Sequence, residues 1–241
     1  MPAWWRELLS YISPERCHAC LGPVQEDIVE HQFCVNCTFE MTKGAGITCF
    51  RCGAEVAAHI ETTSGCLACL RDRFAFDQVL RMGPYDGLLR EIVLKCKQSN
   101  GEILAEAAGY HFGCSLKNSA GLELPTAIVP VPSHWTRLLW RGHNPALGVA
   151  LGLARALKVQ CCPNWLRRTR PTPRQTTLTP KQRRLNLHGA IRHDVPARAK
   201  GCTVWIVDDV LTTGTTASAS SRALLDGGAV KVVAVVLARG G

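Results

Sequence analysis

Val204-Trp-Ile-Val-Asp-Asp-Val-Leu-Thr-Thr-Gly-Thr-Thr216 is the stretch that decides the fold. Its apolar run ends in two acids, and a loop of small residues follows before a helical pattern starts at Ala217. Apolar strands that alternate with helices are typical of a parallel α/β sheet covered on both faces. Ligands of such sheets bind at the carboxyl edge of the strands, where we expect Asp208 and Asp209 to lie.

The loop that follows the acids, Thr212-Thr-Gly-Thr-Thr216, has the composition of an anion site. Backbone N–H groups of such a loop, together with the start of a helix, attract a phosphate, and Gly214 allows its close approach. Two carboxylates beside a phosphate would repel it unless hydroxyls or Mg²⁺ lay between them. Asp208 and Asp209 therefore suit a ribose 2′,3′-diol or a metal-bound sugar phosphate. The sequence has no GxxxxGK[ST] motif, which excludes a Walker loop.

Further elements of the same pattern are expected on the N-terminal side of this stretch and after it. Asp86 is predicted to cap a helix that runs to Cys96. The remaining predictions are helices at about 102–114, 146–157 and 217–225, strands at 127–131, 203–207 and 230–237, and a connector at about 71–84.

Positive charge is concentrated in the C-terminal two thirds of the chain. Residues 81–241 contain 22 Lys/Arg and 9 Asp/Glu, and no acid occurs between Glu123 and Asp194. Residues 167–184 form a long basic stretch without hydrophobic periodicity, which is typical of a functional loop. This distribution favours a polyanionic partner such as a phosphate ester or nucleic acid; a merely basic surface is the alternative.

Eight of the thirteen cysteines form four CxxC pairs, and the unit CxxC-x13-CxxC occurs twice, 32 residues apart. Two such knuckles supply the four thiolates of a tetrahedral zinc site. Pairing within each repeat predicts two structural sites, and an interleaved pairing is the alternative. The predicted ligands are Cys17, Cys20, Cys34 and Cys37 for one zinc, and Cys49, Cys52, Cys66 and Cys69 for the other.

Other uses of these cysteines are less favoured. Dithiol redox chemistry would need CxxC at a helix N-terminus within an α/β unit, and this segment lacks that pattern. His18, His31 and His59 could replace ligands, but eight cysteines suffice for two sites. The N-terminus has Arg6 and Glu7 within its apolar stretch, unlike a signal peptide, and no apolar run reaches membrane-spanning length. We therefore expect a cytoplasmic protein without membrane insertion.

The segment 204–216 resembles the motif by which type I phosphoribosyltransferases bind phosphoribosyl pyrophosphate (PRPP), and the wider chain resembles the ComF/GntX family of bacterial competence and DNA-utilisation proteins. Besides the CxxC repeats, that resemblance rests on Tyr85–Arg90, Lys95, Ile128–Pro132, Arg137, Arg141, Gly142, Asn144, Arg168, Thr169, Gln175, Leu178, Arg184, Asn186, Gly189 and Ala190. The family usually reads Arg-Gly-Phe-Asn-Gln where this chain has His143 and Pro145 in place of Phe and Gln.

The resemblance implies a double zinc-ribbon domain at 1–72 and a PRPP-binding, phosphoribosyltransferase-like domain at 73–241. It implies Asp208 and Asp209 on the ribose hydroxyls, also as the catalytic pair of a transferase. It implies the ligand loop around the 5′-phosphate: Val210, Thr212, Thr213, Gly214, Thr215 and Thr216. It further suggests Arg137 and Arg141 for the pyrophosphate, Lys95 above the site, and Arg168, Arg174 and Arg184 in a closing loop.

Three functions are compatible with these features. The first is PRPP and Mg²⁺ binding in DNA uptake, with single-stranded DNA stacking on Trp135 and Trp140; buried aromatics are the alternative for those two. The second is a phosphoribosyltransferase that makes a nucleotide from a free base, although no motif identifies a base pocket. The third is a non-catalytic adaptor whose zinc ribbons dock a DNA-translocation protein.

Overall fold

The core of the protein is a five-stranded sheet in which all neighbouring strands run parallel, in the order β1-β7-β6-β2-β3. The structure is a computed structural model that describes residues 16–24, 32–43, 46–58, 60–70, 72–119, 121–133, 142–170, 189–196 and 200–240. The strands are β1 (Gln78–Pro84), β2 (Ala127–Pro130), β3 (Gln160–Cys161), β6 (Thr203–Leu211) and β7 (Lys231–Arg239).

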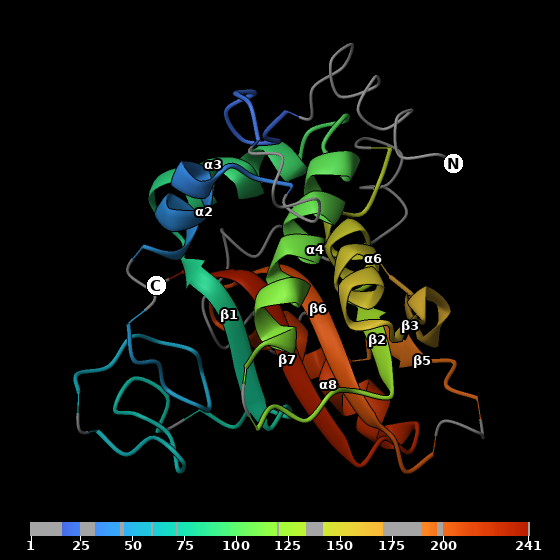
Figure 1. The fold of residues 1–241 in the computed structure, drawn as a ribbon. Coiled ribbons are helices and arrows are strands. Elements are labelled where there is room, and N and C mark those ends of the chain that lie inside the picture. Colours follow the sequence, from blue (N-terminus) through green and yellow to red (C-terminus); the bar gives the residue numbers. More distant parts are fainter. Residues whose placement is uncertain are drawn as a thin grey trace.

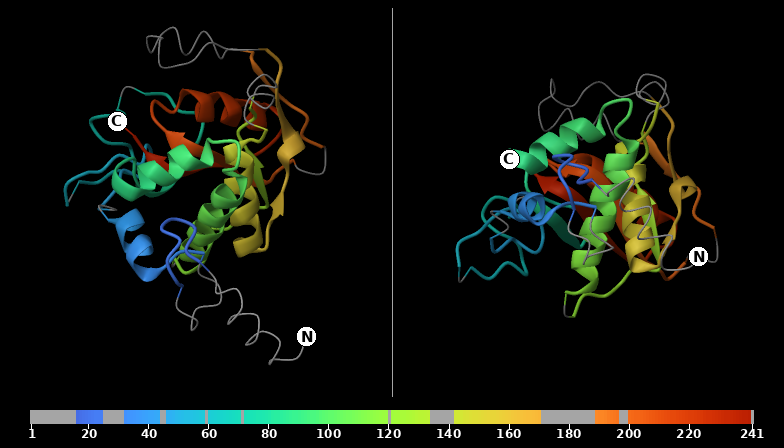
Figure 2. Two further views of the ribbon diagram at one scale, coloured as in Figure 1. Left: turned by 90° about the horizontal axis from the view of Figure 1, so that it is seen from above. Right: turned by 45° about the horizontal axis from the view of Figure 1, so that its top comes forward.

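Helices cover both faces of this sheet, as Figures 1 and 2 show. One face carries α3 (Gly87–Cys96), α4 (Glu102–Lys117) and α6 (Pro145–Leu157). The other carries α8 (Thr215–Asp226) and an antiparallel ribbon made of β4 (Leu166–Arg168) and β5 (Ile191–His193). A short 3-10 helix, η1 (Pro163–Trp165), precedes β4. The prediction of a parallel α/β sheet is confirmed.

Side-chain alternation along β6 decides which face each functional residue meets. Trp205 and Val207 are buried among the helices α3, α4 and α6, whereas Val204 and Ile206 are buried on the α8 face. The register against β7 continues without a break through Asp208 and Val210. Because successive side chains of a strand point to opposite faces, Asp208 belongs to the α8 face and the next acid to the α3 face.

The chain between the cysteine repeats and the first predicted helix is where the sequence prediction was wrong. Residues 78–84 are not a connector but the edge strand β1, hydrogen-bonded in register to β7. The helix that follows begins as predicted, since the Asp86 side chain accepts a hydrogen bond from Gly87 N at 2.7 Å. The other predicted elements are present, and β6 extends to Leu211, beyond the predicted end at residue 207.

The N-terminal cysteine-rich region lies against the sheet domain in two places. The first repeat, with α2 (Val35–Thr42), contributes Phe33 and Met41 to the same core as α3 and α4, and Phe33 meets the ring of His111 edge-on at 5.6 Å. The second repeat lies beside β1, where Val79 N donates to Phe50 O at 3.0 Å. Among the described residues, no helix combines the length and apolar character needed to cross a membrane.

Candidate functional site

The two acids of β6 lie at the carboxyl edge of the sheet, where the neighbouring strand β2 has just ended. Val131 N, one residue beyond β2, donates to Val207 O at 2.8 Å, so Asp208 and Asp209 extend past that strand. Asp209 N donates to the Asp208 carboxylate at 2.9 Å. Both acids are half-buried. The edge therefore presents two carboxylates that remain accessible to a ligand.

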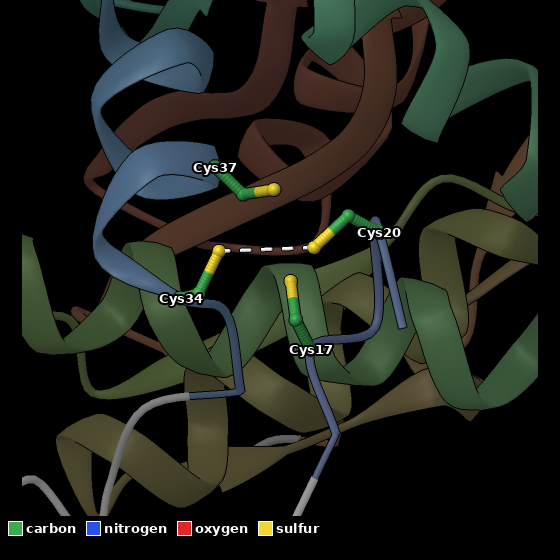
Figure 3. Close-up of side chains that lie close together, drawn as sticks. All are labelled: Cys17, Cys20, Cys34 and Cys37. Atoms are coloured by element: carbon green, nitrogen blue, oxygen red, sulfur yellow. Dashed lines mark hydrogen bonds between the residues drawn. The ribbon is translucent and has the colours of Figure 1, made fainter. Parts of the chain in front are cut away.

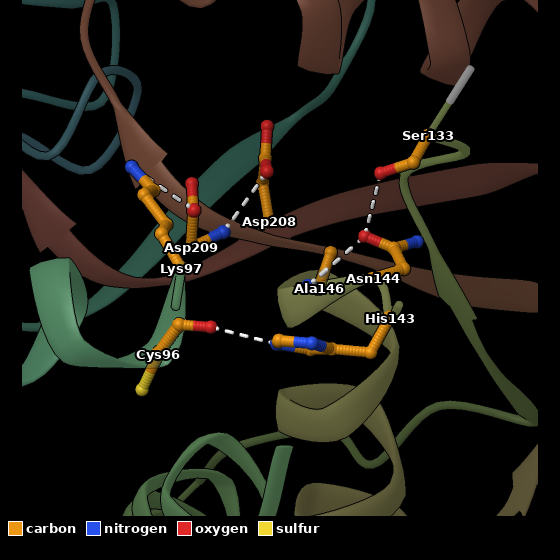
Figure 4. Close-up of polar contacts among 8 residues, drawn as sticks. All are labelled: Cys96, Lys97, Ser133, His143, Asn144, Ala146, Asp208 and Asp209. Carbon is orange, nitrogen blue, oxygen red and sulfur yellow. Dashed lines mark hydrogen bonds and ion pairs between the residues drawn. The ribbon is translucent and has the colours of Figure 1, made fainter. Parts of the chain in front are cut away.

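Lys97 contacts this acidic pair from above, at the end of α3 (Figure 4). Its Nζ lies 3.1 Å from a carboxylate oxygen of Asp209, and the two side chains are only 28% and 16% exposed. Sequence reasoning named Lys95, which lies exposed in the last turn of α3, and missed Lys97. The residue immediately after a helix can turn back toward the sheet, and no sequence pattern specified that it does so here.

Asp208 has a strongly perturbed carboxyl group. Burial raises its pKa to about 7, the negative charge of Asp209 raises it further, and Lys97 and Arg168 oppose the shift. The influence of Arg168 places this half-buried arginine of β4 close enough to act on the acid from the α8 face. A carboxyl with such a pKa can be either a donor or an acceptor toward ligand hydroxyls near neutral pH.

The loop after the acids leads directly into α8, whose first-turn N–H groups have no acceptor within the helix. Gly214 is the N-cap residue and has φ +69°, in the left-handed region that favours glycine. The hydroxyls of Thr213 and Thr215 are 2.9 Å apart, and Thr212 and Thr213 are exposed. Accessible hydroxyls and helix amides together make an anion-binding loop. The structure thus brings the acids, Val210 and residues 212–216 to one edge.

A polar cradle, which the sequence did not predict, fixes the elements around the acids (Figure 4). Asn144 Nδ2 donates to Val131 O at 3.0 Å, while its Oδ1 accepts from Ser133 Oγ at 2.9 Å and from Ala146 N at 3.3 Å. One side chain therefore caps α6 and holds the end of β2.

His143 explains one of the two departures from the family pattern. Its Nε2 is 2.9 Å from the carbonyl oxygen of Cys96, the last residue of α3. The ring is buried, so this contact ties the start of α6 to the segment that carries Lys97. The second departure, Pro145, occupies the first turn of α6, where proline fits because its missing N–H has no partner there anyway.

Several predicted site residues lie outside the described residues. These are Arg137, Arg141, Arg174 and Arg184, together with the two tryptophans Trp135 and Trp140. Their assignments remain predictions.

The eight CxxC cysteines form two separate clusters, with the pairing predicted from the repeat. In each cluster all four sulfurs lie within 4.8 Å of one another. Figure 3 shows the first, in which the sulfurs of Cys20 and Cys34 are 3.8 Å apart. In the second, Cys52 and Cys66 are 3.7 Å apart.

These spacings fit zinc. Tetrahedral coordination with Zn–S bonds of about 2.3 Å places sulfurs about 3.8 Å apart, whereas a disulfide needs about 2.05 Å. Burial and the neighbouring thiols raise the pKa of Cys37. For Cys17, burial acts in the same direction, but hydrogen bonds from the backbone amides of the cluster outweigh it and lower the pKa to about 7. Such closely packed thiols can be deprotonated together only beside a cation.

Comparisons with known proteins agree with this architecture, although no protein-family model matches the chain. DNA utilization protein YhgH of Salmonella typhimurium is 33% identical over 195 residues, which cover 79% of this chain and 83% of the relative. YhgH of Escherichia coli K12 is 29% identical over 230 residues, or 94% of this chain and 97% of the relative. Competence protein F of Haemophilus influenzae is 29% identical over 218 residues, or 87% and 90%.

Among solved structures, glutamine PRPP amidotransferase from B. subtilis, complexed with ADP and GMP, matches 60% of this chain and 30% of its own. The TM-score is 0.41 and the identity 19%.

Proposed function

Because the chain belongs to the ComF/GntX family of competence and DNA-utilisation proteins, we propose that it acts in DNA uptake or use by binding PRPP with Mg²⁺ at the sheet edge and by contacting single-stranded DNA. The observation that carries the PRPP assignment is one juxtaposition. The acids Asp208 and Asp209 lie directly before an anion-binding loop, at the carboxyl edge of a parallel sheet.

Each part of this edge suits a different part of PRPP. The hydroxyls and helix amides of residues 212–216 would bind the 5′-phosphate. Asp208 and Asp209 would accept hydrogen bonds from the ribose hydroxyls, and the partly protonated Asp208 could also donate one. The carboxylates and hydroxyls present are the hard oxygen donors that Mg²⁺ prefers. Mg²⁺ carried by the pyrophosphate oxygens would supply neutralisation of their charge.

Two cations approach the acidic pair from opposite faces of the sheet. Lys97 is ion-paired with Asp209 on the α3 face, and Arg168 acts on Asp208 from the ribbon. When the acids turn to ribose hydroxyls, these cations become available for the pyrophosphate charge. The site would then exchange internal ion pairs for contacts with the ligand.

Calorimetric titration with PRPP, with and without Mg²⁺, on zinc-loaded protein tests this assignment. We expect Mg²⁺-dependent binding to the wild type and its loss in Asp208→Asn/Asp209→Asn with the fold intact. Unchanged affinity of the folded double variant refutes the site.

The DNA part of the proposal is supported by the β4–β5 ribbon. Arg167 and Arg192 are exposed and stand directly opposite each other across its two strands. Like charges at such positions destabilise a ribbon. Asp194 pairs with Arg167 at 3.0 Å, so one acid faces two guanidinium groups and the surface stays positive. A nucleic-acid backbone would neutralise that charge.

Salt-dependent binding of a fluorescent oligothymidylate tests this surface. Replacing Arg167 and Arg192 by Gln should reduce the slope of log affinity against log salt by about 1. Arg155→Gln is the matched control, because Arg155 is an exposed arginine of α6 that pairs with Glu106. Equal slopes for both variants contradict the assignment.

A catalytic phosphoribosyl transfer is the second candidate function, and the flanking cations favour it because they could stabilise a departing pyrophosphate. Incubation with PRPP and a panel of free bases, followed by assay of pyrophosphate, distinguishes the two. Release with one base establishes a transferase. PRPP binding without release from any base supports a sensing role, in which the cysteine clusters dock a DNA-translocation protein.

A further inference from the structure

The second cysteine cluster is connected to the phosphate loop by a single arginine side chain. Arg239, the last residue of β7, donates from Nε to the carbonyl oxygen of Cys52 at 3.0 Å. From Nη1 it donates to the carbonyl oxygen of Leu211 at 3.3 Å and also to that of Gly240. Leu211 is the residue immediately before the phosphate loop, so one guanidinium holds a CxxC turn and the entry to that loop together.

Phe74 makes a second connection between the same two regions. Its ring packs against the cluster formed by the second set of cysteines and stacks on Phe76, with the ring centroids 4.7 Å apart. The same ring lies against Gly214, where an added Cβ would be only 2.9 Å from Cε1. Ala75 N donates to Ser218 Oγ of α8 at 3.0 Å, which fixes the segment that carries Phe74.

The segment carrying Phe74 is in turn attached to the CxxC turn. Arg51, which lies inside that turn, donates from Nη2 to the carbonyl oxygen of Asp72 at 2.8 Å. The first cluster is placed differently, since its residues pack with α3 and α4 in the larger core. A change in the geometry of the second cluster therefore has a direct physical route to the phosphate loop.

A metal held by four thiolates would fix the backbone of the CxxC turn, including the Cys52 carbonyl that Arg239 binds. Without that constraint the carbonyl would lose its fixed direction, and the guanidinium would be held only at the loop end. Two sites connected in this way influence each other reciprocally, because whatever one ligand orders costs the other less.

We propose that Arg239 and Phe74 are positioning residues through which metal in the second cluster orders the phosphate loop. PRPP bound at the loop, as the proposed function requires, then slows metal loss from that cluster and leaves the first cluster unaffected. A coupling of about fivefold lies within the usual range for linked sites.

The test follows zinc release and cysteine alkylation on the zinc-loaded full chain. Zinc loss is followed with 4-(2-pyridylazo)resorcinol, and N-ethylmaleimide labelling is mapped by peptide, so that residues 49–69 are read separately from 17–37. With saturating PRPP and Mg²⁺ we expect about fivefold slower zinc loss and labelling in the second cluster, and no change in the first. Equal rates with and without PRPP, or equal slowing in both clusters, overturn the coupling.

Variants separate positioning from a general loss of structure. In Arg239→Gln, with two zinc ions bound and a wild-type circular dichroism spectrum, the PRPP effect on the second cluster should disappear. Arg239→Lys should recover part of it, since one ammonium can reach one of the carbonyls. If Arg239→Gln does not fold, Phe74→Leu takes its place with the same expected loss. Arg155→Gln is the control and should retain the full effect; its loss there contradicts the proposal.

Calorimetry on the same samples distinguishes the two levels of the account. PRPP that binds without affecting zinc release refutes the coupling and leaves the proposed function standing. No PRPP binding to zinc-loaded wild type refutes the proposed function, and the coupling with it.

Discussion

Replacing Asp208 by Asn should make the protein more stable at neutral pH while abolishing its ligand site. Burial and the charge of Asp209 raise the pKa of Asp208 from 3.8 to about 7 in the folded protein. The folded state therefore binds this proton more tightly than the unfolded chain, and stability falls as the pH rises from about 4 to about 7. Asparagine has nearly the same shape and escapes this penalty.

The pKa difference sets the size of the effect. About three pKa units correspond to at most about 4 kcal/mol above pH 7. Because the side chain is partly exposed, screening by solvent reduces this to on the order of 1–2 kcal/mol. For a chain of this size such a gain raises the melting temperature by roughly 2–8 °C. At pH 5 only about a third of the gain should remain, since most of the proton is lost at higher pH.

Thermal unfolding followed by circular dichroism at pH 5 and pH 8, with zinc content measured at both, checks this prediction. Glu91→Gln is the control, because Glu91 is an exposed acid on α3 and its replacement should shift neither melting temperature. A variant at position 208 that is less stable than wild type at pH 8, or equally stabilised at both pH values, would refute the assigned environment of Asp208.

Three other substitutions test separate parts of the structure. Lys97→Met should weaken PRPP binding about tenfold or more in calorimetry, because it removes the cation at Asp209, whereas exposed Lys95→Met should not; the reverse order contradicts the ion pair. Gly214→Ala should lower the melting temperature more than Gly121→Ala, since both glycines have positive φ but only the first meets Phe74, and equal losses would remove that contact from the account. Atomic absorption should find two zinc ions per chain and one in Cys66→Ala, and any other pair of values contradicts the clusters.

The sequence was sufficient for elements whose pattern is local. The apolar run of β6 and the helix after it form as predicted because burial on both faces and a glycine start signal are written in consecutive residues. The grouping of the cysteines followed from the repeat, because two knuckles separated by thirteen residues can close on one ion.

Features that depend on distant partners were not predictable in the same way. β1 reads Gln78-Val-Leu-Arg-Met-Gly-Pro84, and its mixture of Arg, Gly and Pro is extended only because β7 lies beside it. Lys97 acquires its role from the direction in which α3 ends, and His143 from the carbonyl that this end leaves exposed. Such contacts join residues more than forty positions apart, so no window of sequence contains them.

Hydrogen–deuterium exchange of the loop amides tests the central claim most directly. On adding PRPP and Mg²⁺ to zinc-loaded protein, we predict slower exchange at residues 212–216, because an anion bound there accepts hydrogen bonds from those N–H groups. Saturating PRPP binding that leaves the exchange of these amides unchanged would contradict the account, since the ligand would then occupy another part of the molecule.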